Sequence, residues 1–72
     1  MHQATDLTKR EQEVLQLIST GLNAREISTL LFLSPHTVIT HKRNIAMKLQ
    51  AKNVANLVRR GFETGALRVS AN

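Results

Sequence analysis

Glycine and proline are scarce in this chain of 72 residues, and their scarcity is the feature that most restricts its fold. The single proline is Pro35, and no glycine or further proline follows it until Gly61. Because these residues most often interrupt helices, and because apolar side chains recur at three- and four-residue spacing, the sequence predicts helices. No segment shows the alternation that is typical of a strand. We therefore expect an all-α fold of four helices without a sheet.

Each helical block begins with a residue that caps helix N-termini. The first two caps are followed three residues later by a glutamate, which is the spacing of a capping box, and the third precedes a proline at the first helical position. The cap candidates are Thr8, Asn23, Ser34 and Asn53. The predicted helices are residues 8–20, 24–31, 35–48 and 54–64, with Gly21 and Gly65 at the ends of the first and last.

Length and composition indicate one small domain with a polyanionic partner. The hydrophobic content of 42% is enough for a single core, which we place between a disordered leader (1–6) and a C-terminal tail (68–72). No apolar run approaches a membrane span, and no signal-peptide pattern is present, so we expect a cytoplasmic protein. Ten Lys and Arg residues against five Asp and Glu give a net charge of +5. This charge favours nucleic acid as the partner, ahead of an anionic membrane.

Residues suited to catalysis or metal binding are few and poorly placed. His36 and His41 are five positions apart, which turns them about 140° from each other on a helix, so they do not converge on a metal. Asp6 is the single aspartate and precedes the first helix, which argues against a Ser-His-Asp triad. There is no cysteine and no glycine-rich phosphate loop. We predict no enzyme activity, no metal and no cofactor.

The third helix carries an outer face that is unusual for a surface covered by water. Val38, Ile45 and Leu49 form its core stripe. The opposite face collects one arginine, one imidazole, one hydroxyl and several apolar groups: His36, Ile39, Thr40, Arg43, Ala46 and Met47. A face exposed only to water would carry more Glu and Lys, so we predict that a partner covers it. The alternative is that these are ordinary isolated exposed apolar residues.

A short helix, a tight break at 33–34 and a longer helix form the helix-turn-helix arrangement, whose second helix enters the DNA major groove. There arginine reads guanine, whereas threonine and apolar groups contact the thymine methyl. The predicted base-reading residues are His36, Ile39, Thr40, Arg43 and Met47. The start of the helix attracts anions, and basic residues flank the groove. The predicted phosphate-binding residues are Arg25, Ser34, Thr37, His41, Lys42, Lys48, Lys52 and Asn53.

Several stretches of the chain resemble one family when they are read together. They are Leu7-Thr8-x-Arg10-Glu11-x-Glu13-Val14-Leu15, Gly21, Glu26-Ile27-Ser28, Leu31-Phe32-Leu33-Ser34 and Thr37-Val38-x-Thr40-His41-x-x-Asn44-Ile45-x-x-Lys48-Leu49. The sequence resembles the LuxR-type (GerE-like) helix-turn-helix domain of bacterial transcription regulators. The resemblance covers residues 7–67, and the combined spacing is highly specific although no single stretch is.

The resemblance implies a four-helix domain of the LuxR C-terminal, winged-helix-like type, with its helix-turn-helix motif at about 24–43. It implies regulation of transcription through double-stranded DNA, with base contacts at Ile39, Thr40 and Arg43. Independently of the resemblance, we interpret the Arg59-Arg60 pair as a solvated face of the fourth helix, with a second phosphate contact or an RNA polymerase contact as alternatives. The resemblance also implies a homodimer through the fourth helix, for which we predict contacts at Val54, Leu57, Val58 and Gly61. Such domains commonly follow a receiver or ligand-binding domain.

The chain departs from the family pattern at three positions. A basic residue is frequent where Ile39 stands, a glycine where Gln50 stands and an arginine where Val54 stands. Two rival interpretations stay open: region 4 of a sigma factor, which has a similar motif, and a protein-interaction module that uses Ile39, Met47 and the fourth helix. The predicted fourth helix favours the LuxR-type interpretation over the sigma-factor one.

Overall fold

Four helices and no strand make up the part of the chain that the computed structural model describes, residues 7–67. They are α1 (Lys9–Ser19), α2 (Ala24–Leu31), α3 (Pro35–Leu49) and α4 (Val54–Glu63). The all-α prediction is confirmed, and each predicted helix end lies within one residue of the observed one. The predicted leader and tail, including His2 and Asp6, lie outside the described residues.

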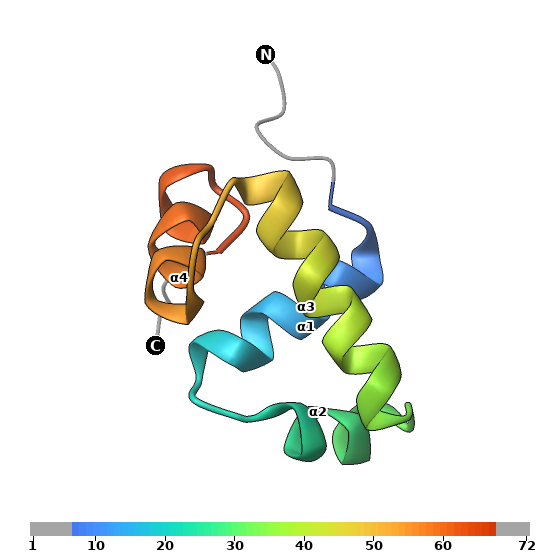
Figure 1. Ribbon diagram of the computed structural model, residues 1–72. Coiled ribbons are helices and arrows are strands. Elements are labelled where there is room, and N and C mark those ends of the chain that lie inside the picture. The colour runs from blue at the N-terminus through green and yellow to red at the C-terminus, as the bar shows by residue number, and fades with distance from the viewer. Residues whose placement is uncertain (1–6, 68–72) are drawn as a thin grey trace.

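The helices pack around α3, which contacts the other three. Figure 1 shows α3 passing in front of α1, with α2 near the N-terminal end of α3 and α4 beside its C-terminal half. Within residues 7–67, no helix combines the length and the apolar character that crossing a membrane requires.

The helix starts follow the cap signals of the sequence. Thr8 and Glu11 form a reciprocal capping box, in which the Glu11 N–H donates to Thr8 Oγ1 at 3.1 Å and the Thr8 N–H donates to Glu11 Oε1 at 2.9 Å. Asn23 and Glu26 do the same at the start of α2. The Thr37 N–H donates to Ser34 Oγ at 3.1 Å, and Asn53 caps α4 in the same manner. These bonds satisfy N–H groups that have no partner inside the helices.

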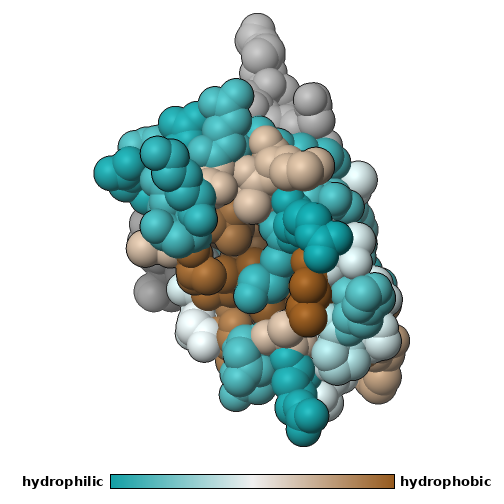
Figure 2. Space-filling view, viewed as in Figure 1, coloured by the Kyte–Doolittle hydropathy of each residue, from teal (hydrophilic) through white to brown (hydrophobic). Residues whose placement is uncertain are grey.

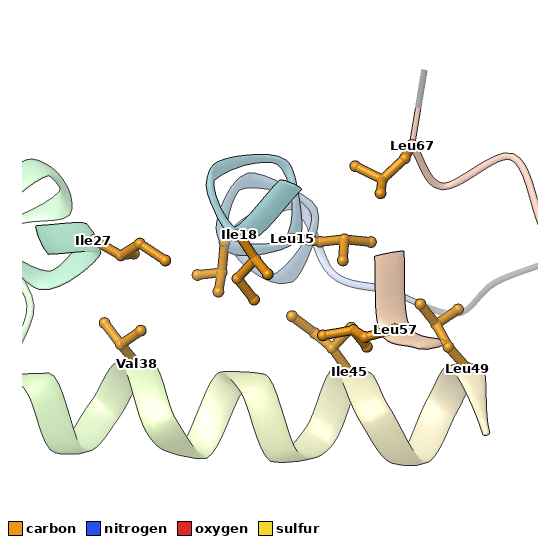
Figure 3. Packing of buried hydrophobic residues seen from close by; sticks show 9 residues of the cluster. Leu15, Ile18, Ile27, Val38, Ile45, Leu49, Leu57 and Leu67 are labelled. Carbon is orange, nitrogen blue, oxygen red and sulfur yellow. The ribbon is translucent and has the colours of Figure 1, made fainter. Parts of the chain in front are cut away.

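One apolar cluster joins all four helices. Ile27 of α2 faces Val38 of α3, while Ile45 and Leu57 meet where α3 passes α4 (Figure 3). Leu67, which follows α4, completes the cluster. The buried members are Val14, Leu15, Ile18, Ile27, Val38, Ile45, Leu49, Leu57 and Leu67. The predicted core stripe of the third helix is therefore confirmed.

A charged contact ties α3 to α1 beside this core. Lys48 Nζ lies 2.7 Å from Glu11 Oε1, the same oxygen that accepts the Thr8 N–H. The Glu11 side chain is nearly buried. Burial raises the pKa of this carboxyl, but the hydrogen bonds from Lys48 and Thr8 and the charges of Lys48 and His41 together outweigh burial, so the pKa lies below its usual value. Glu11 thus caps α1 and anchors α3 with one carboxylate.

We predict that Glu11→Gln lowers the free energy of unfolding by about 1–3 kcal/mol at neutral pH, because a charge-assisted hydrogen bond is lost in a buried place. Because the folded pKa is depressed, the contribution of Glu11 is complete above the unfolded value, about 4.3, and is lost as the pH falls through the folded pKa. Urea unfolding between pH 7 and pH 3 measures both effects. Glu13→Gln, at an exposed position of α1, is the matched control. Identical profiles for the two variants would contradict the assignment.

Two helices end in a left-handed residue that is not glycine. Phe32 (φ 57°) ends α2 and Gln50 (φ 56°) ends α3. At each site the next backbone N–H closes the turn, from Leu33 to the Ser28 carbonyl at 2.9 Å and from Ala51 to the Ala46 carbonyl at 2.8 Å. A side chain costs about 1–2 kcal/mol in this conformation relative to glycine. The chain adopts it because the turns require it.

We predict that Gln50→Gly raises the free energy of unfolding by about 0.5–1 kcal/mol, the strain relieved less the extra entropy of glycine in the unfolded chain. A gain of this size raises Tm by about 2–8 °C in a domain this small. Thermal unfolding measures the shift. Gln50→Ala, which keeps a Cβ at the strained position, is the control and should give no such gain.

Candidate nucleic-acid interface

The outer face of α3 is exposed because the opposite side of the helix is buried. Val38, Ile45 and Leu49 fix the rotation of the helix about its own axis. Ile39 is then 46% exposed and Met47 68% exposed, and His36 and Arg43 are also exposed. Thr40 and Ala46 are half-buried, so they lie at the edge of this face and not in its most exposed part. The outer face that the sequence predicts is therefore present.

The turn between α2 and α3 is short and is closed by hydrogen bonds. The Phe32 and Leu33 N–H groups both donate to the Ser28 carbonyl, and Leu33 packs against the core. The Ser34 hydroxyl contacts the Thr37 hydroxyl at 2.9 Å in addition to capping α3. Phe32 itself points outward and is 94% exposed. The turn thus sets the start of α3 while leaving an aromatic ring on the surface.

A groove of about 290 Å³ separates the outer face of α3 from the start of α4. Figure 2 shows hydrophobic surface gathered in the recess between these helices, with hydrophilic surface around it. The lining brings two predicted base-reading residues, Ile39 and Arg43, beside three predicted phosphate-binding residues, Lys42, Lys52 and Asn53. The rest of the lining is Ala46, Ala51, Val54 and Leu57. The positively charged side chains of the lining therefore surround the apolar bottom of one groove on one side of the molecule.

Of the predicted phosphate-binding residues, Lys48, His41 and Arg25 do not line this groove, and Asn53, which does, also caps α4. The Lys48 ammonium is directed at Glu11 on α1. His41 is half-buried, and its Nδ1 has no hydrogen-bond partner among the residues that the structure describes. Asn53 Oδ1 accepts from the Asn56 N–H at 2.8 Å, so this oxygen already serves as the cap of α4. Arg25 is exposed on α2, outside the groove lining.

The buried side of α4 includes two residues that the sequence assigned to a dimer interface. Leu57 lies in the core. Gly61 is also buried, and a Cβ at its position would lie 2.7 Å from Leu67 Cδ1 and 3.3 Å from Leu15 Cδ2. The prediction for Leu57 and Gly61 is therefore corrected, because both face the interior of the same protomer. The exposed apolar flank of α4 consists instead of Val54, Ala55, half-buried Val58 and Phe62.

Comparison with known proteins decides the family. The family model described as bacterial regulatory proteins of the luxR family matches residues 5–60. The chain belongs to the LuxR family. It is 42% identical over 57 residues to the transcriptional regulatory protein UhpA of Escherichia coli K12, covering 79% of this chain and 29% of UhpA. It is 37% identical over 59 residues to the transcriptional regulatory protein FixJ of Rhizobium meliloti, covering 82% of this chain and 29% of FixJ.

A third relative is the oxygen regulatory protein NreC of Staphylococcus carnosus, at 46% identity over 52 residues, which cover 72% of this chain and 24% of NreC. The chain spans less than a third of the length of UhpA, FixJ and NreC. The family assignment confirms the resemblance and the four-helix helix-turn-helix fold. It supports DNA-binding regulation of transcription as the function class and places the chain in a regulatory family, not in a family of enzymes.

The LuxR-family domain also uses residues whose roles the sequence did not reveal. Arg60, which the sequence placed on a solvated face with Arg59, donates from Nε to the Leu49 carbonyl of α3 at 3.0 Å. Lys48 anchors α3 to α1. The two contacts join residues that are 11 and 37 positions apart and lie on different helices, so no spacing within one helix indicates them. The left-handed Gln50 did leave a signal, since the family pattern favours glycine at that position.

Proposed function

We propose that this LuxR-family domain binds double-stranded DNA in a sequence-specific manner, with α3 in the major groove, and so regulates transcription in the bacterial cytoplasm. The observation that carries the proposal is the position of Arg43 and Ile39 on the exposed face of α3, beside Lys42 and Lys52. A guanidinium can bond two acceptors of guanine, and an apolar side chain fits the thymine methyl. His36, Thr40 and Met47 complete the proposed reading set.

Phosphate contacts come in this proposal from both sides of the groove. Lys42 stands on the α3 side, and Lys52 and Asn53 stand on the α4 side. Ser34 and Thr37 lie at the N-terminus of α3, which favours anions. Arg25, His41 and Lys48 remain predicted phosphate contacts, and a phosphate at Lys48 would compete with the ion pair between Lys48 and Glu11. An RNA polymerase contact stays a further prediction.

Selection of bound sites from a random duplex library tests the proposal. It reports DNA binding, base preference and half-site symmetry in one experiment. We expect a recurring motif. If log K falls with log salt at a slope of about −4 per domain, about four phosphates are neutralised. Binding that does not depend on salt, or a library without enrichment, would remove the proposed function.

We predict that Arg43→Ala weakens binding to the selected site by about 1–3 kcal/mol and relaxes base preference at one position. Fluorescence anisotropy against the selected duplex and its single-base variants measures both effects. The control is Arg59→Ala, which removes the same charge from an exposed position of α4. The assignment of Arg43 fails if the two variants lose affinity equally and the base preference is unchanged.

We further propose that the domain binds DNA as a homodimer through the exposed flank of α4. Val54, Val58 and Phe62 lie on this flank together with Ala55. Their side chains leave an apolar stripe outside the core, and a second copy of the same stripe could cover it in a symmetric interface. This retains Val54 and Val58 from the original dimer prediction and replaces Leu57 and Gly61 by Phe62 and Ala55.

We predict that Phe62→Gln weakens self-association by about tenfold, since part of a phenylalanine surface is no longer buried at the interface. Sedimentation equilibrium measures the effect. Phe32→Gln, at the other phenylalanine of the chain, is the matched control and should leave self-association unchanged. The reverse result would move the interface to the turn between α2 and α3.

The second candidate function is that of a protein-interaction module. It is favoured by the exposure of Phe32, Ile39 and Met47, three large apolar side chains on or before α3. Anisotropy with random duplex DNA at low salt discriminates between the candidates. A DNA-binding domain of this charge should bind such a duplex, whereas a module that recognises only protein should not.

A further inference from the structure

The last carbonyl of α3 is held by a side chain of α4. Arg60 Nε donates to the Leu49 carbonyl oxygen at 3.0 Å, and Nη1 of the same guanidinium lies 3.1 Å from Glu63 Oε1. Carbonyl groups in the last turn of a helix have no partner inside that helix. The guanidinium therefore caps α3 from the neighbouring helix, while Glu63 fixes the orientation of its plane.

This contact acts together with the link between the two helices. The link from Gln50 to Asn53 is short, and the Gln50 and Ala51 N–H groups donate back into the last turn of α3. Leu49 packs in the core from the same turn. The Arg60 side chain adds a second connection between α3 and α4, seven residues beyond the cap of α4. On α3 both the link and Arg60 hold the same end of the helix, but on α4 they act seven residues apart, so α4 is fixed to the end of α3 at two positions along its length, in addition to the packing of Ile45 against Leu57.

Arg60 and the exposed apolar flank lie on different sides of α4. At about 100° per residue, the position of Arg60 is rotated about the axis of α4 by roughly 160° from the positions of both Val58 and Phe62. A second copy seated on the flank would therefore leave the contact with Leu49 in place. The helix would then face its partner with one side and hold the end of α3 with the other.

We propose that Arg60 is a positioning residue that fixes the angle between the DNA-reading helix α3 and the dimerisation helix α4. It thereby sets the separation of the two reading helices in a dimer, and hence the spacing of the half-sites that the dimer prefers. The inference rests on the proposed function, both its DNA-binding part and its dimer part. Arg60 contacts neither base nor phosphate in this role.

Arg59 offers a matched comparison on the same helix. Its Nε lies 3.7 Å from Glu63 Oε2, so both arginines pair with the same carboxylate. The Arg59 side chain is 71% exposed and that of Arg60 is 35% exposed. Substituting either residue by glutamine removes one positive charge, but only the Arg60 substitution removes the hydrogen bond to Leu49.

The experiment compares wild type, Arg60→Gln, Arg60→Lys and Arg59→Gln on three kinds of duplex. The first duplex carries a single selected half-site. The second carries two half-sites at the selected spacing. The third kind is a set of duplexes in which one or two base pairs are added to or removed from the spacer between the two half-sites. We expect Arg59→Gln to keep the wild-type ratio of paired-site to single-site affinity. Arg60→Gln should lower that ratio about tenfold, the effect of losing one charge-assisted hydrogen bond, and should flatten the dependence on spacing.

Arg60→Lys separates positioning from charge. Lysine keeps the positive charge but lacks the planar guanidinium, which donates hydrogen bonds to the Leu49 carbonyl and to the Glu63 carboxylate at the same time. We expect it to behave as Arg60→Gln does in the spacing series. Recovery of wild-type spacing preference by Arg60→Lys would overturn the inference, because the charge alone would then suffice. If Arg60→Gln does not fold, as judged by thermal unfolding, Arg60→Lys alone decides.

The remaining outcomes are distinct. If Arg60→Gln and Arg59→Gln give the same ratio and the same spacing preference, the inference is overturned while the proposed function stands. If wild type binds DNA but shows no preference for paired half-sites, the dimer proposal and this inference both fail, and reading by α3 stands. If wild type binds no duplex, the proposed function itself fails.

Discussion

The rotation of α3 about its own axis is the constraint on which the rest of the molecule depends. Val38, Ile45 and Leu49 are buried against residues from the other helices, and a turn of the helix in either direction would expose at least one of them. Fully burying such a side chain is worth about 1.5–3 kcal/mol. The same rotation places Arg43 and Ile39 outside. The chemistry offered to a partner is therefore set by what α3 buries.

Three further contacts hold α3 along its length. Ser34 caps its start, Glu11 binds Lys48 near its end, and Arg60 bonds the final carbonyl. They come from the turn before α3, from α1 and from α4, so three separate parts of the chain contribute polar contacts to the position of one helix. A domain this small buries only about 60% of its unfolded surface and cannot rely on its core alone. Polar contacts at both ends of α3 compensate for that small core.

Much of the fold could be predicted from local signals. The spacing of Thr8 to Glu11 and of Asn23 to Glu26 gave the first two helix starts, and Ser34-Pro35 gave the third. The periodicity of Val38, Ile45 and Leu49 gave the exposed face of α3. On α4 the same reasoning failed for Leu57 and Gly61. An apolar stripe on a short helix shows that something covers it, but not whether the cover is the chain's own Leu15 and Leu67 or a second copy.

By itself, the sequence determined where the helices begin and end and which face of α3 is free, because these depend on neighbours within a few helical turns. It also determined to which family the chain is similar, because that similarity depends on the order and spacing of residues along nearly the whole chain. Only the tertiary structure decided that Lys48 points at Glu11, that Arg60 bonds the end of α3, and that Lys42 and Lys52 line one groove. These contacts join positions that are far apart in the chain or on different helices. Their existence depends on how the helices cross, which no local spacing specifies.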